Sequence, residues 1–459
     1  MLIRNAEVEG TRCDVRLGGG RVVEIGAGLR PSGDDGDEGE VIDAAGGALI
    51  PGLTDHHIHL FATAADLSST VCGPPNVRTP AELSAVLCQA VPDDDGWIRG
   101  VRYHESVAGP LDAARLDELR ADVPVRIQHR SGALWMLNSL AAKTLGLSGE
   151  DRVTGRLWRA DAWLRSRLSP QPPSLRELGR LLIGYGITWV TDATPDLAPG
   201  AIEAITAAMA TGDLPQHVQL LGAPLGASPS PEAARGPIAG PWKIVLADSA
   251  LPTFDELADA VSAAHDVGRP VAVHTVTRES LVLLLAVFAE TGSLHGDRLE
   301  HAALVPAELI ASIRRLGLRV VTQPGFIADR GDDYLREIPA ADQPDLYRCA
   351  SLCAAAVPLA LSSDAPYGPL DPWAVMSAAT MRRTRAGAVV GRSERLTPRQ
   401  ALDGYLGPAS DPDGPTQRVH VGAPADLVLL HVSMHEVLTS QNAGLVRLGV
   451  IDGKCHTPN

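Results

Sequence analysis

Side chains that can bind metal ions stand at the ends of several short apolar runs in this 459-residue chain. These side chains are His57, His59, His274, His301 and Asp364. Residues two apart on an extended strand point to the same side, so His57 and His59 can converge on one ion through neutral imidazole nitrogens. Polar groups at the ends of four separate apolar strands are hard to explain by packing. Their joint pattern predicts a metal site.

Lysine is rare in this chain, and one lysine stands inside an apolar run. The sequence has 40 basic residues besides histidine, but only Lys143, Lys243 and Lys454 are lysines. Lys243 lies in the strand-like segment WKIVLAD. Two readings of Lys243 stay open from the residues alone: a group that takes part in the metal site, or a lysine that reaches solvent or forms a salt bridge.

Eight short apolar runs, mostly separated by helix-like segments, are typical of repeated β-α units. The runs span 48–59, 187–194, 217–222, 242–248, 270–275, 298–301, 319–323 and 358–364. Eight parallel units predict a (β/α)8 TIM barrel, in which sites form at the carboxyl ends of the strands. About 250 residues suffice for such a barrel. The excess lies in the chain ends and in an insertion after the first barrel strand, at about 70–175.

Both chain ends have the alternating pattern of strands and turns. We expect residues 1–50 and 415–459 to form one small β-sandwich domain beside a barrel domain of residues 51–414. The insertion has its own apolar strands at 97–103 and 125–129, followed by a helix-like stretch that includes Trp135 and Asn138.

The composition predicts a globular protein, with 45% hydrophobic and 21% charged residues. A net charge of −15 argues against nucleic-acid binding. The longest apolar run has nine residues (281–289), which is too short to span a membrane. Six cysteines without CxxC spacing and no visible secretory signal lead us to expect a cytoplasmic protein. A symmetric homodimer is the default expectation for its assembly.

The whole set of motifs resembles the amidohydrolase superfamily. The resemblance rests on H-x-H in the first run, lysine in the fourth, histidine in the fifth and sixth, and aspartate in the eighth. The segments GGALIPGLTDHHIHL and GAPADLVLL are similar to that superfamily's entry into and exit from the barrel. The insertion segments GWIRGVRYHES and PVRIQHRSGALWMLNSLA resemble the YtcJ-like branch, amidohydrolase family 3. The chain departs from that branch at 130–133, which reads RSGA where an aspartate-glycine-histidine stretch is common, so a substrate preference does not carry over.

The resemblance implies a ligand set for divalent metal ions. His57, His59 and Asp364 would hold one metal, and His274 and His301 a second. Lys243 would bridge the two as its N6-carboxylated form, because a carbamate supplies two anionic oxygens and a free ammonium has no lone pair. Neutral imidazoles and oxygen ligands suit zinc, with manganese, cobalt or iron as substitutes.

Such a site has the parts for hydrolysis of an amide-type C–N bond in a small molecule. A metal-activated hydroxide would attack the carbonyl carbon, and Asp364 would take the proton of the attacking water and pass it to the leaving nitrogen. His129 would donate a hydrogen bond to the substrate carbonyl. Further candidates for substrate contact are Tyr103, His104, Gln323, Asp329 and Arg330. Glu105, which follows His104, is another candidate.

Two other functions stay open. The first is a deaminase with one metal at His57, His59, His274 and Asp364, which would have no need of a bridging Lys243. The second is a non-catalytic scaffold on the same fold, although every expected ligand position is filled.

Overall fold

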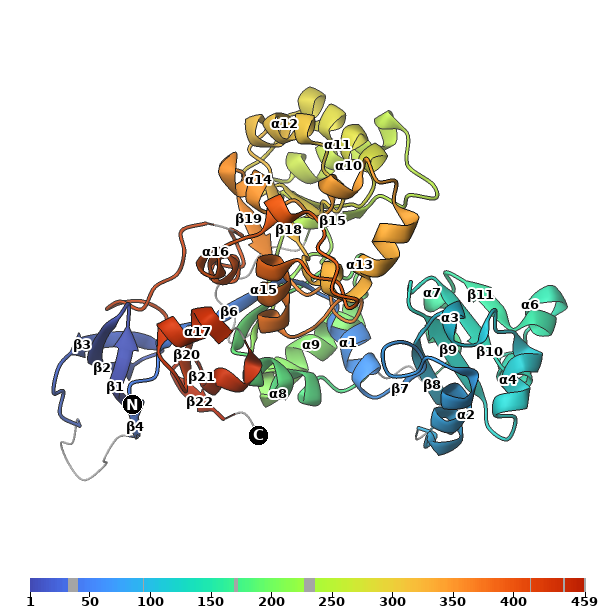
Figure 1. Cartoon of the computed structure of the whole chain (residues 1–459), viewed down its shortest axis with the longest axis horizontal. Coiled ribbons are helices and arrows are strands. Elements are labelled where there is room, and N and C mark those ends of the chain that lie inside the picture. Colours follow the sequence, from blue (N-terminus) through green and yellow to red (C-terminus); the bar gives the residue numbers. More distant parts are fainter. Residues whose placement is uncertain are drawn as a thin grey trace. The chain divides into compact units, whose positions relative to one another are not determined.

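The chain forms two compact units in the computed structural model (Figure 1), one of residues 1–60 with 175–459 and the other of residues 61–174. The structure describes residues 1–31, 40–93, 95–168, 172–226, 236–412, 414–440 and 442–457. The fold is mixed α/β with parallel sheets. Among the described residues, none of the helices has the length and apolar character to cross a membrane.

Two parallel sheets form the centre of the first unit. The four-stranded sheet has the order β14 (Ile238–Ala239), β13 (His217–Leu220), β12 (Ile187–Asp192) and β6 (Leu53–Ile58). The five-stranded sheet has the order β15 (Trp242–Val245), β16 (Val271–Thr275), β17 (Arg298–His301), β18 (Arg319–Thr322) and β19 (Leu359–Leu361). Each of the eight apolar runs therefore contains a strand, and β14 is an additional short one.

Hydrogen bonds connect the two parallel sheets at both of their edges. The backbone N–H of Lys243, on β15, donates to the carbonyl oxygen of Leu221, next to β13, at 3.0 Å. On the other side, the N–H of Asp364, just after β19, donates to the carbonyl oxygen of His57, on β6, at 2.8 Å. The carboxyl ends of strands far apart in the sequence are thereby brought to one edge.

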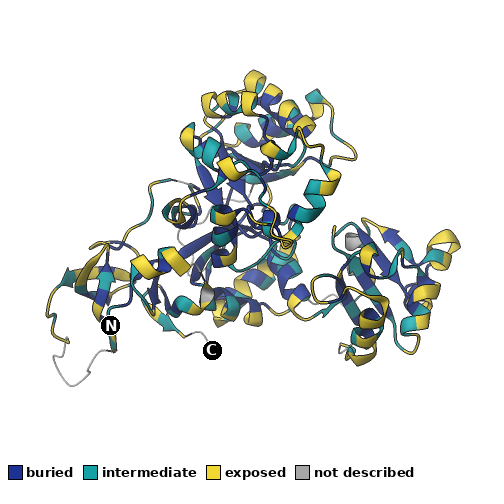
Figure 2. Cartoon of the chain, viewed as in Figure 1, coloured by how far each residue is buried: buried dark blue, intermediate teal, exposed yellow. Residues whose placement is uncertain are grey.

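Helices between these strands cover the parallel sheets with their apolar faces, and their outer faces are exposed (Figure 2). Helix α10 (Phe254–Asp266) shows why the chain is helical there. Thr253 and Glu256 form a capping box at its start, which satisfies two backbone N–H groups that the first turn leaves unpaired. Leu257, Val261 and Ala264 follow at helical spacing and are buried. Its neighbour α11 (Arg278–Thr291) packs against α10 and also contacts β16.

Two further sheets are built from the chain ends. One has the order β3 (Arg21–Gly26), β2 (Thr11–Gly18), β1 (Leu2–Val8) and β4 (Val41–Asp43). The other has the order β22 (Lys454–His456), β21 (Val446–Ile451), β20 (Leu427–Leu430) and β5 (Leu49–Pro51). Buried side chains of both sheets, among them Ile3, Val15, Leu427 and Val450, belong to one apolar cluster.

The second unit has a five-stranded sheet of its own. Its order is β11 (Arg156–Trp158), β10 (Leu134–Leu137), β9 (Val125–His129), β8 (Ile98–Tyr103) and β7 (Thr70–Val71). The expectation of a helix-like stretch around Trp135 was wrong. Trp135 lies on β10, paired with Gln128 and Leu157, because the neighbouring strands provide hydrogen-bond partners that a four-residue apolar run does not reveal. Asn138 follows the strand and caps α5 (Ser139–Thr144) by accepting the N–H of Ala141.

Candidate metal centre

The predicted metal ligands of the first unit come from five strands of the two parallel sheets. The ligand positions are His57 on β6, His59 just after it, Lys243 on β15, His274 on β16, His301 at the end of β17 and Asp364 just after β19. Strands β15, β16 and β17 are neighbours in one sheet, and the hydrogen bonds between β6 and the segment after β19 bring the remaining positions to the same edge.

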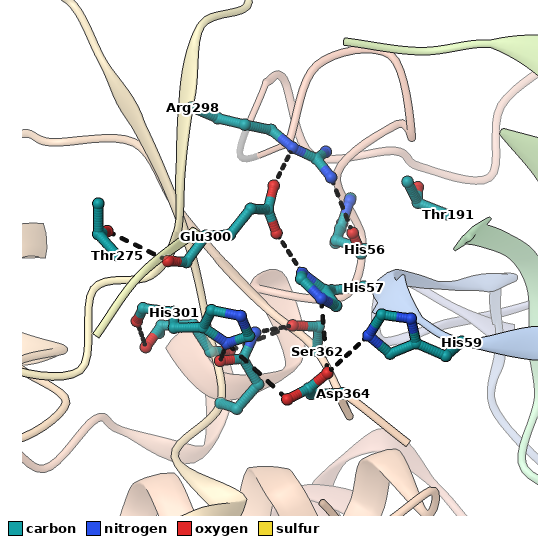
Figure 3. Close-up of polar contacts among 12 residues, drawn as sticks. His56, His57, His59, Thr191, Thr275, Arg298, Glu300, His301, Ser362 and Asp364 are labelled. Atoms are coloured by element: carbon teal, nitrogen blue, oxygen red, sulfur yellow. Dashed lines mark hydrogen bonds and ion pairs between the residues drawn. The ribbon is translucent and has the colours of Figure 1, made fainter. Parts of the chain in front are cut away.

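The carboxylate of Asp364 lies among three imidazoles (Figure 3). Its Oδ1 atom is 3.4 Å from Nε2 of His57 and 3.3 Å from Nε2 of His59, and its Oδ2 atom is 3.9 Å from Nδ1 of His301. His274 packs against His301, with 4.5 Å between the two ring centroids. The structure thus brings four histidines and one aspartate together.

Lys243 interacts electrostatically with Asp364 and with Glu300. Its ammonium nitrogen is buried and has no hydrogen-bond partner in the described structure. Burial lowers the pKa of Lys243 to about 8, although Glu300 and Asp364 partly oppose this effect. A lysine with this pKa has an appreciable neutral fraction near pH 7.

The backbone at two of these positions is left-handed. His301 has a φ of 70° and Asp364 a φ of 52°, a region that costs non-glycine residues on the order of 1 kcal/mol or more. Both residues stand where their strand ends, so the unusual φ turns each side chain out of the regular strand alternation. A cost of this kind, at two residues whose side chains meet, is typical of functional sites.

A buried ion pair between Arg298 and Glu300 orients the His57 ring. It was not predicted from the sequence. The Nδ1–H of His57 donates to Oε2 of Glu300, and Nε of Arg298 donates to Oε1 of the same carboxylate at 2.5 Å. Arg298 also donates to the carbonyl oxygen of His56 at 3.1 Å. The Arg298 and Glu300 side chains are 0% exposed. The only signal in the sequence was two charged residues of opposite sign, two apart, in the apolar strand RLEH.

A second positioning contact holds His301. Its Nδ1–H donates to Oε1 of Gln323 at 2.9 Å, and the Gln323 amide donates to Oγ of Ser362 at 2.9 Å. Gln323 is fully buried. Its amide therefore orients a predicted ligand, and its contact with substrate stays a prediction.

Burial sets the charge state of the site. It lowers the pKa of His57 far below the ordinary value, that of His274 to about 3, and that of His301 in the same direction. Burial opposes ionisation of Asp364, but the close approach of His59, His301 and His57 outweighs it and holds the pKa of this carboxyl below its ordinary value. The imidazoles of His57, His274 and His301 are therefore neutral, and the aspartate is ionised.

These charge states fit a bound cation. Because Nδ1 of His57 donates to Glu300, the neutral ring has a lone pair on Nε2, and this lone pair faces the carboxylate oxygen Oδ1 of Asp364. Neither of these two buried atoms has a hydrogen-bond partner in the described structure. Two acceptors that face each other in a buried site repel unless a cation lies between them. The donor set therefore fits a divalent metal.

Asp55 accepts hydrogen bonds from the backbone and does not orient an imidazole ring. Its Oδ1 atom accepts the backbone N–H groups of His57 at 3.2 Å and of Ser363 at 3.1 Å. This carboxyl connects β6 to the segment after β19, whereas Glu300 orients the His57 ring.

Asp329 and Arg330 lie on α13 (Gly325–Glu337). Asp329 forms an ion pair with Arg385. Arg330 donates to the carbonyl oxygen of Tyr367 at 2.7 Å, and the Tyr367 ring packs edge-on against His59 with 5.5 Å between centroids. Arg330 thereby supports a residue next to the metal centre, and substrate contact by Asp329 and Arg330 stays a prediction.

The predicted residues of the insertion belong to the second unit. Tyr103 is buried and donates its hydroxyl to the carbonyl oxygen of Gly109. His104 directly follows β8, and His129 ends the neighbouring parallel strand β9. Nε2 of His129 lies 3.0 Å from a carboxylate oxygen of Glu105. The roles of these residues in the reaction stay predictions.

Each of these two histidines is followed by the same short turn. The backbone N–H of Ser106 donates to Nδ1 of His104, and that of Ser131 donates to Nδ1 of His129. When neutral, each ring must therefore have its proton on Nε2, so His129 presents an N–H donor, which in this structure is directed at Glu105.

Comparison with known proteins gives consistent results. The sequence model described as "Amidohydrolase family" matches residues 40–456. An N-substituted formamide deformylase of Arthrobacter pascens is 25% identical, over 85% of this chain and 84% of that protein. Two uncharacterised metal-dependent hydrolases share the fold. The one from Pyrococcus horikoshii has a TM-score of 0.75 at 19% identity, covering 99% of both chains. The one from Pyrococcus furiosus has a TM-score of 0.71 at 20% identity, covering 94% of this chain and 98% of that chain.

Proposed function

Because the chain belongs to the amidohydrolase family and is a hydrolase of carbon–nitrogen bonds other than peptide bonds, we propose that it is a metal-dependent hydrolase that cleaves an amide-type bond of a small molecule. One metal would be held by His57, His59 and Asp364, and a second by His274 and His301. The observation that carries this proposal is the arrangement of imidazole nitrogens around one ionised carboxylate. When bound, divalent zinc, or manganese, cobalt or iron, supplies the Lewis acidity that polarises a carbonyl and acidifies water.

Asp364 is the proposed proton carrier. It is ionised at neutral pH and lies at the carboxyl ends of the parallel strands. It can therefore accept a proton from the attacking water at a carboxylate oxygen. Returning that proton to the leaving nitrogen releases a neutral amine. His57 and His301 keep their own protons on Nδ1, directed at Glu300 and Gln323, so neither competes for this role.

Lys243 is the proposed bridge between the metals, as its carbamate. A pKa of about 8 leaves about 10% of the side chain as neutral amine at pH 7, whereas an ordinary lysine has less than about 0.1%. The neutral amine is the form that reacts with carbon dioxide. The unpartnered nitrogen supports this proposal, because a carboxylated side chain would bring its own oxygens to the surrounding ligands.

The architecture proposed from the sequence is retained here. Residues 51–414 would form a (β/α)8 barrel, supported by the hydrogen bonds that connect the two parallel sheets at both edges. Residues 1–50 and 415–459 would form a β-sandwich, supported by the apolar cluster that their sheets share. His129 is proposed as a hydrogen-bond donor to the substrate carbonyl, since its turn leaves Nε2 as the donor nitrogen.

An N-substituted amide is the proposed substrate class, and the deformylase relative makes N-formyl amines the first compounds to test. The experiment incubates zinc- and manganese-loaded protein with N-formyl amines, N-acyl amino acids, cyclic amides and aminopurines, and identifies products by mass spectrometry. A carboxylate and an amine in equal amounts support the proposal, and Asp364→Asn should abolish their formation. Asp259→Asn, an exposed change on α10, is the matched control.

The two alternatives give different outcomes in the same experiment. Ammonia release from an aminopurine, by protein with a single metal, would establish the deaminase. Protein that is purified without chelator and contains no stoichiometric metal would establish the scaffold.

A further inference from the structure

A second cluster of metal-binding side chains lies at the opposite ends of the parallel strands. His217 is the first residue of β13, and its ring stacks on Trp189 of β12, the residue paired with it across the two strands, at 4.4 Å between centroids. Asp426 directly precedes β20, and Asp452 directly follows β21. The cluster therefore connects the amino end of the four-stranded parallel sheet to the antiparallel strands β20 and β21.

The geometry of this cluster is that of ligands around one ion. Nε2 of His217 lies 3.2 Å from Oδ2 of Asp426 and 3.5 Å from Oδ1 of Asp452, and one ligand atom from each residue lies within 4.8 Å of the others. Two ligand atoms held at tetrahedral angles by zinc bonds of ~2.05 Å are ~3.3 Å apart. Nε2 of His217 is buried but makes no hydrogen bond of acceptable geometry in the described structure. In the candidate metal centre, Nε2 of His57 and Oδ1 of Asp364 likewise lie close together, and neither atom makes a hydrogen bond in the described structure.

Hydrogen bonds hold the Asp426 carboxylate in place, and a tight turn directs the Asp452 side chain. The backbone N–H of Asp452 donates to Oδ1 of Asp426 at 2.8 Å, and the indole N–H of Trp189 donates to Oδ2 of Asp426 at 3.3 Å. Asp452 has a φ of 50° and is followed by Gly453, also left-handed, so a tight two-residue turn sets the direction of its side chain. Carboxylates fixed by hydrogen bonds from other groups are typical of metal ligands.

The charges balance with a divalent ion. Two aspartates contribute two negative charges and a neutral imidazole contributes none, so a 2+ ion brings the set to zero. An imidazolium would leave one negative charge uncompensated among these three side chains. One nitrogen and two carboxylate oxygens suit zinc or manganese.

The remaining cluster, His104, Glu105 and His129, has a comparable set of side chains but does not fit a cation. Nδ1 of each of its histidines accepts a backbone N–H, so each Nε2 keeps a proton and offers no lone pair. Binding a metal at Nε2 there would require an imidazolate. No such hydrogen bond is made at His217, whose Nε2 faces the two carboxylates.

We propose that His217, Asp426 and Asp452 bind one divalent transition-metal ion, of the zinc class, which fastens the β20–β21 strand pair to the parallel sheet and leaves the fourth position to water. The proposal does not depend on the hydrolase function, because these residues lie at the strand ends opposite the candidate metal centre.

The test counts metal in the full-length protein. Wild-type protein, Asp452→Asn, His217→Gln and the exposed control Asp259→Asn are dialysed against buffered zinc and analysed by mass spectrometry of the metal. Both cluster variants should lose one equivalent of zinc, and the control should lose none. Asparagine tolerates the left-handed backbone of position 452, and Asp452 is exposed, so this variant preserves the turn.

A double variant separates the two centres. Protein with both Lys243→Ala and Asp452→Asn should lose as much zinc as the two single variants lose together. Wild-type zinc content in Asp452→Asn and His217→Gln would overturn the proposal and leave an ordinary ion pair. A double variant that loses no more than Lys243→Ala alone would also overturn it, because the missing ion would then belong to the first centre.

Discussion

Replacing Glu300 by glutamine tests whether the buried ion pair behind His57 prepares this histidine to bind metal. In the native protein the Glu300 carboxylate accepts from Nδ1 of His57 and from Nε of Arg298. The glutamine amide has nearly the same size and keeps one acceptor oxygen. Its NH2 group must then face one of two donors, either the Arg298 guanidinium or the His57 ring, and the negative charge is lost.

Two separate losses follow from the geometry. Arg298 and Glu300 are both 0% exposed, so removing one partner leaves a buried unpaired charge, which costs about 3–5 kcal/mol of unfolding free energy. The second loss concerns the metal. Removing a carboxylate that orients a ligating histidine weakens metal affinity by about 10–100-fold, which corresponds to about 1.4–2.7 kcal/mol.

The assay measures both quantities on the same samples. Urea unfolding of the zinc-loaded and metal-free forms gives stability, and competition with a zinc chelator gives affinity. Glu394→Gln is the matched control, because Glu394 is also a buried carboxylate, 2.9 Å from Arg348 and bonded to the N–H of Ser351. The control should lose stability of the metal-free form and keep wild-type zinc affinity.

A Glu300→Gln protein that loses stability but binds zinc as tightly as the Glu394→Gln control would refute the reasoning. The ion pair would then be a structural element of β17 without influence on His57.

Three further predictions concern the site and the thiols. In the Asp452→Asn background, which lacks the ion of the second cluster, Lys243→Ala should reduce bound metal from about two equivalents to one or less, measured on protein purified without chelator, since the proposed bridge is lost. Gln323→Ala leaves the buried Nδ1–H of His301 without its acceptor and should weaken zinc binding by about 10-fold in the same chelator competition. Burial raises the pKa of Cys72 to about 12, so at pH 8 only about one thiol in 10,000 is the reactive thiolate, and alkylation followed by peptide mass spectrometry should label exposed Cys88 long before Cys72.

Each of these predictions has a result that would contradict it. Two equivalents of metal in the double variant Lys243→Ala, Asp452→Asn would remove the bridging role. For Gln323, the control is Gln216→Ala, a buried glutamine whose amide donates to backbone carbonyls on β12 and at Gly179, and equal zinc affinity in the two variants would contradict the positioning role. Alkylation of Cys72 as fast as Cys88 in the folded protein would contradict its burial.

The sequence alone indicated the residue types of the candidate metal centre and the alternation of strands and helices that positions them. His57 and His59 needed only the two-residue period of a strand, and the eight apolar runs needed only their hydrophobic pattern and the helix-like segments between them. The residues that end these runs identified the family, because they belong to a set of motifs that sequence comparison recognises. These features depend only on residues that are close together in the chain, so they can be recognised from the sequence without the fold.

Only the tertiary structure decided which polar groups support the ligands. Glu300 reaches His57 across 243 positions, and Gln323 reaches His301 from the next strand. Such pairs depend on the register between strands and on the left-handed backbone at His301 and Asp364, neither of which follows from residue spacing. Trp135 shows the same limit, since a short apolar run becomes a strand only when neighbouring strands accept its hydrogen bonds. Register and backbone turn are set by packing across the whole unit. For that reason the sequence indicated the candidate ligands, and the fold determined which groups hold them.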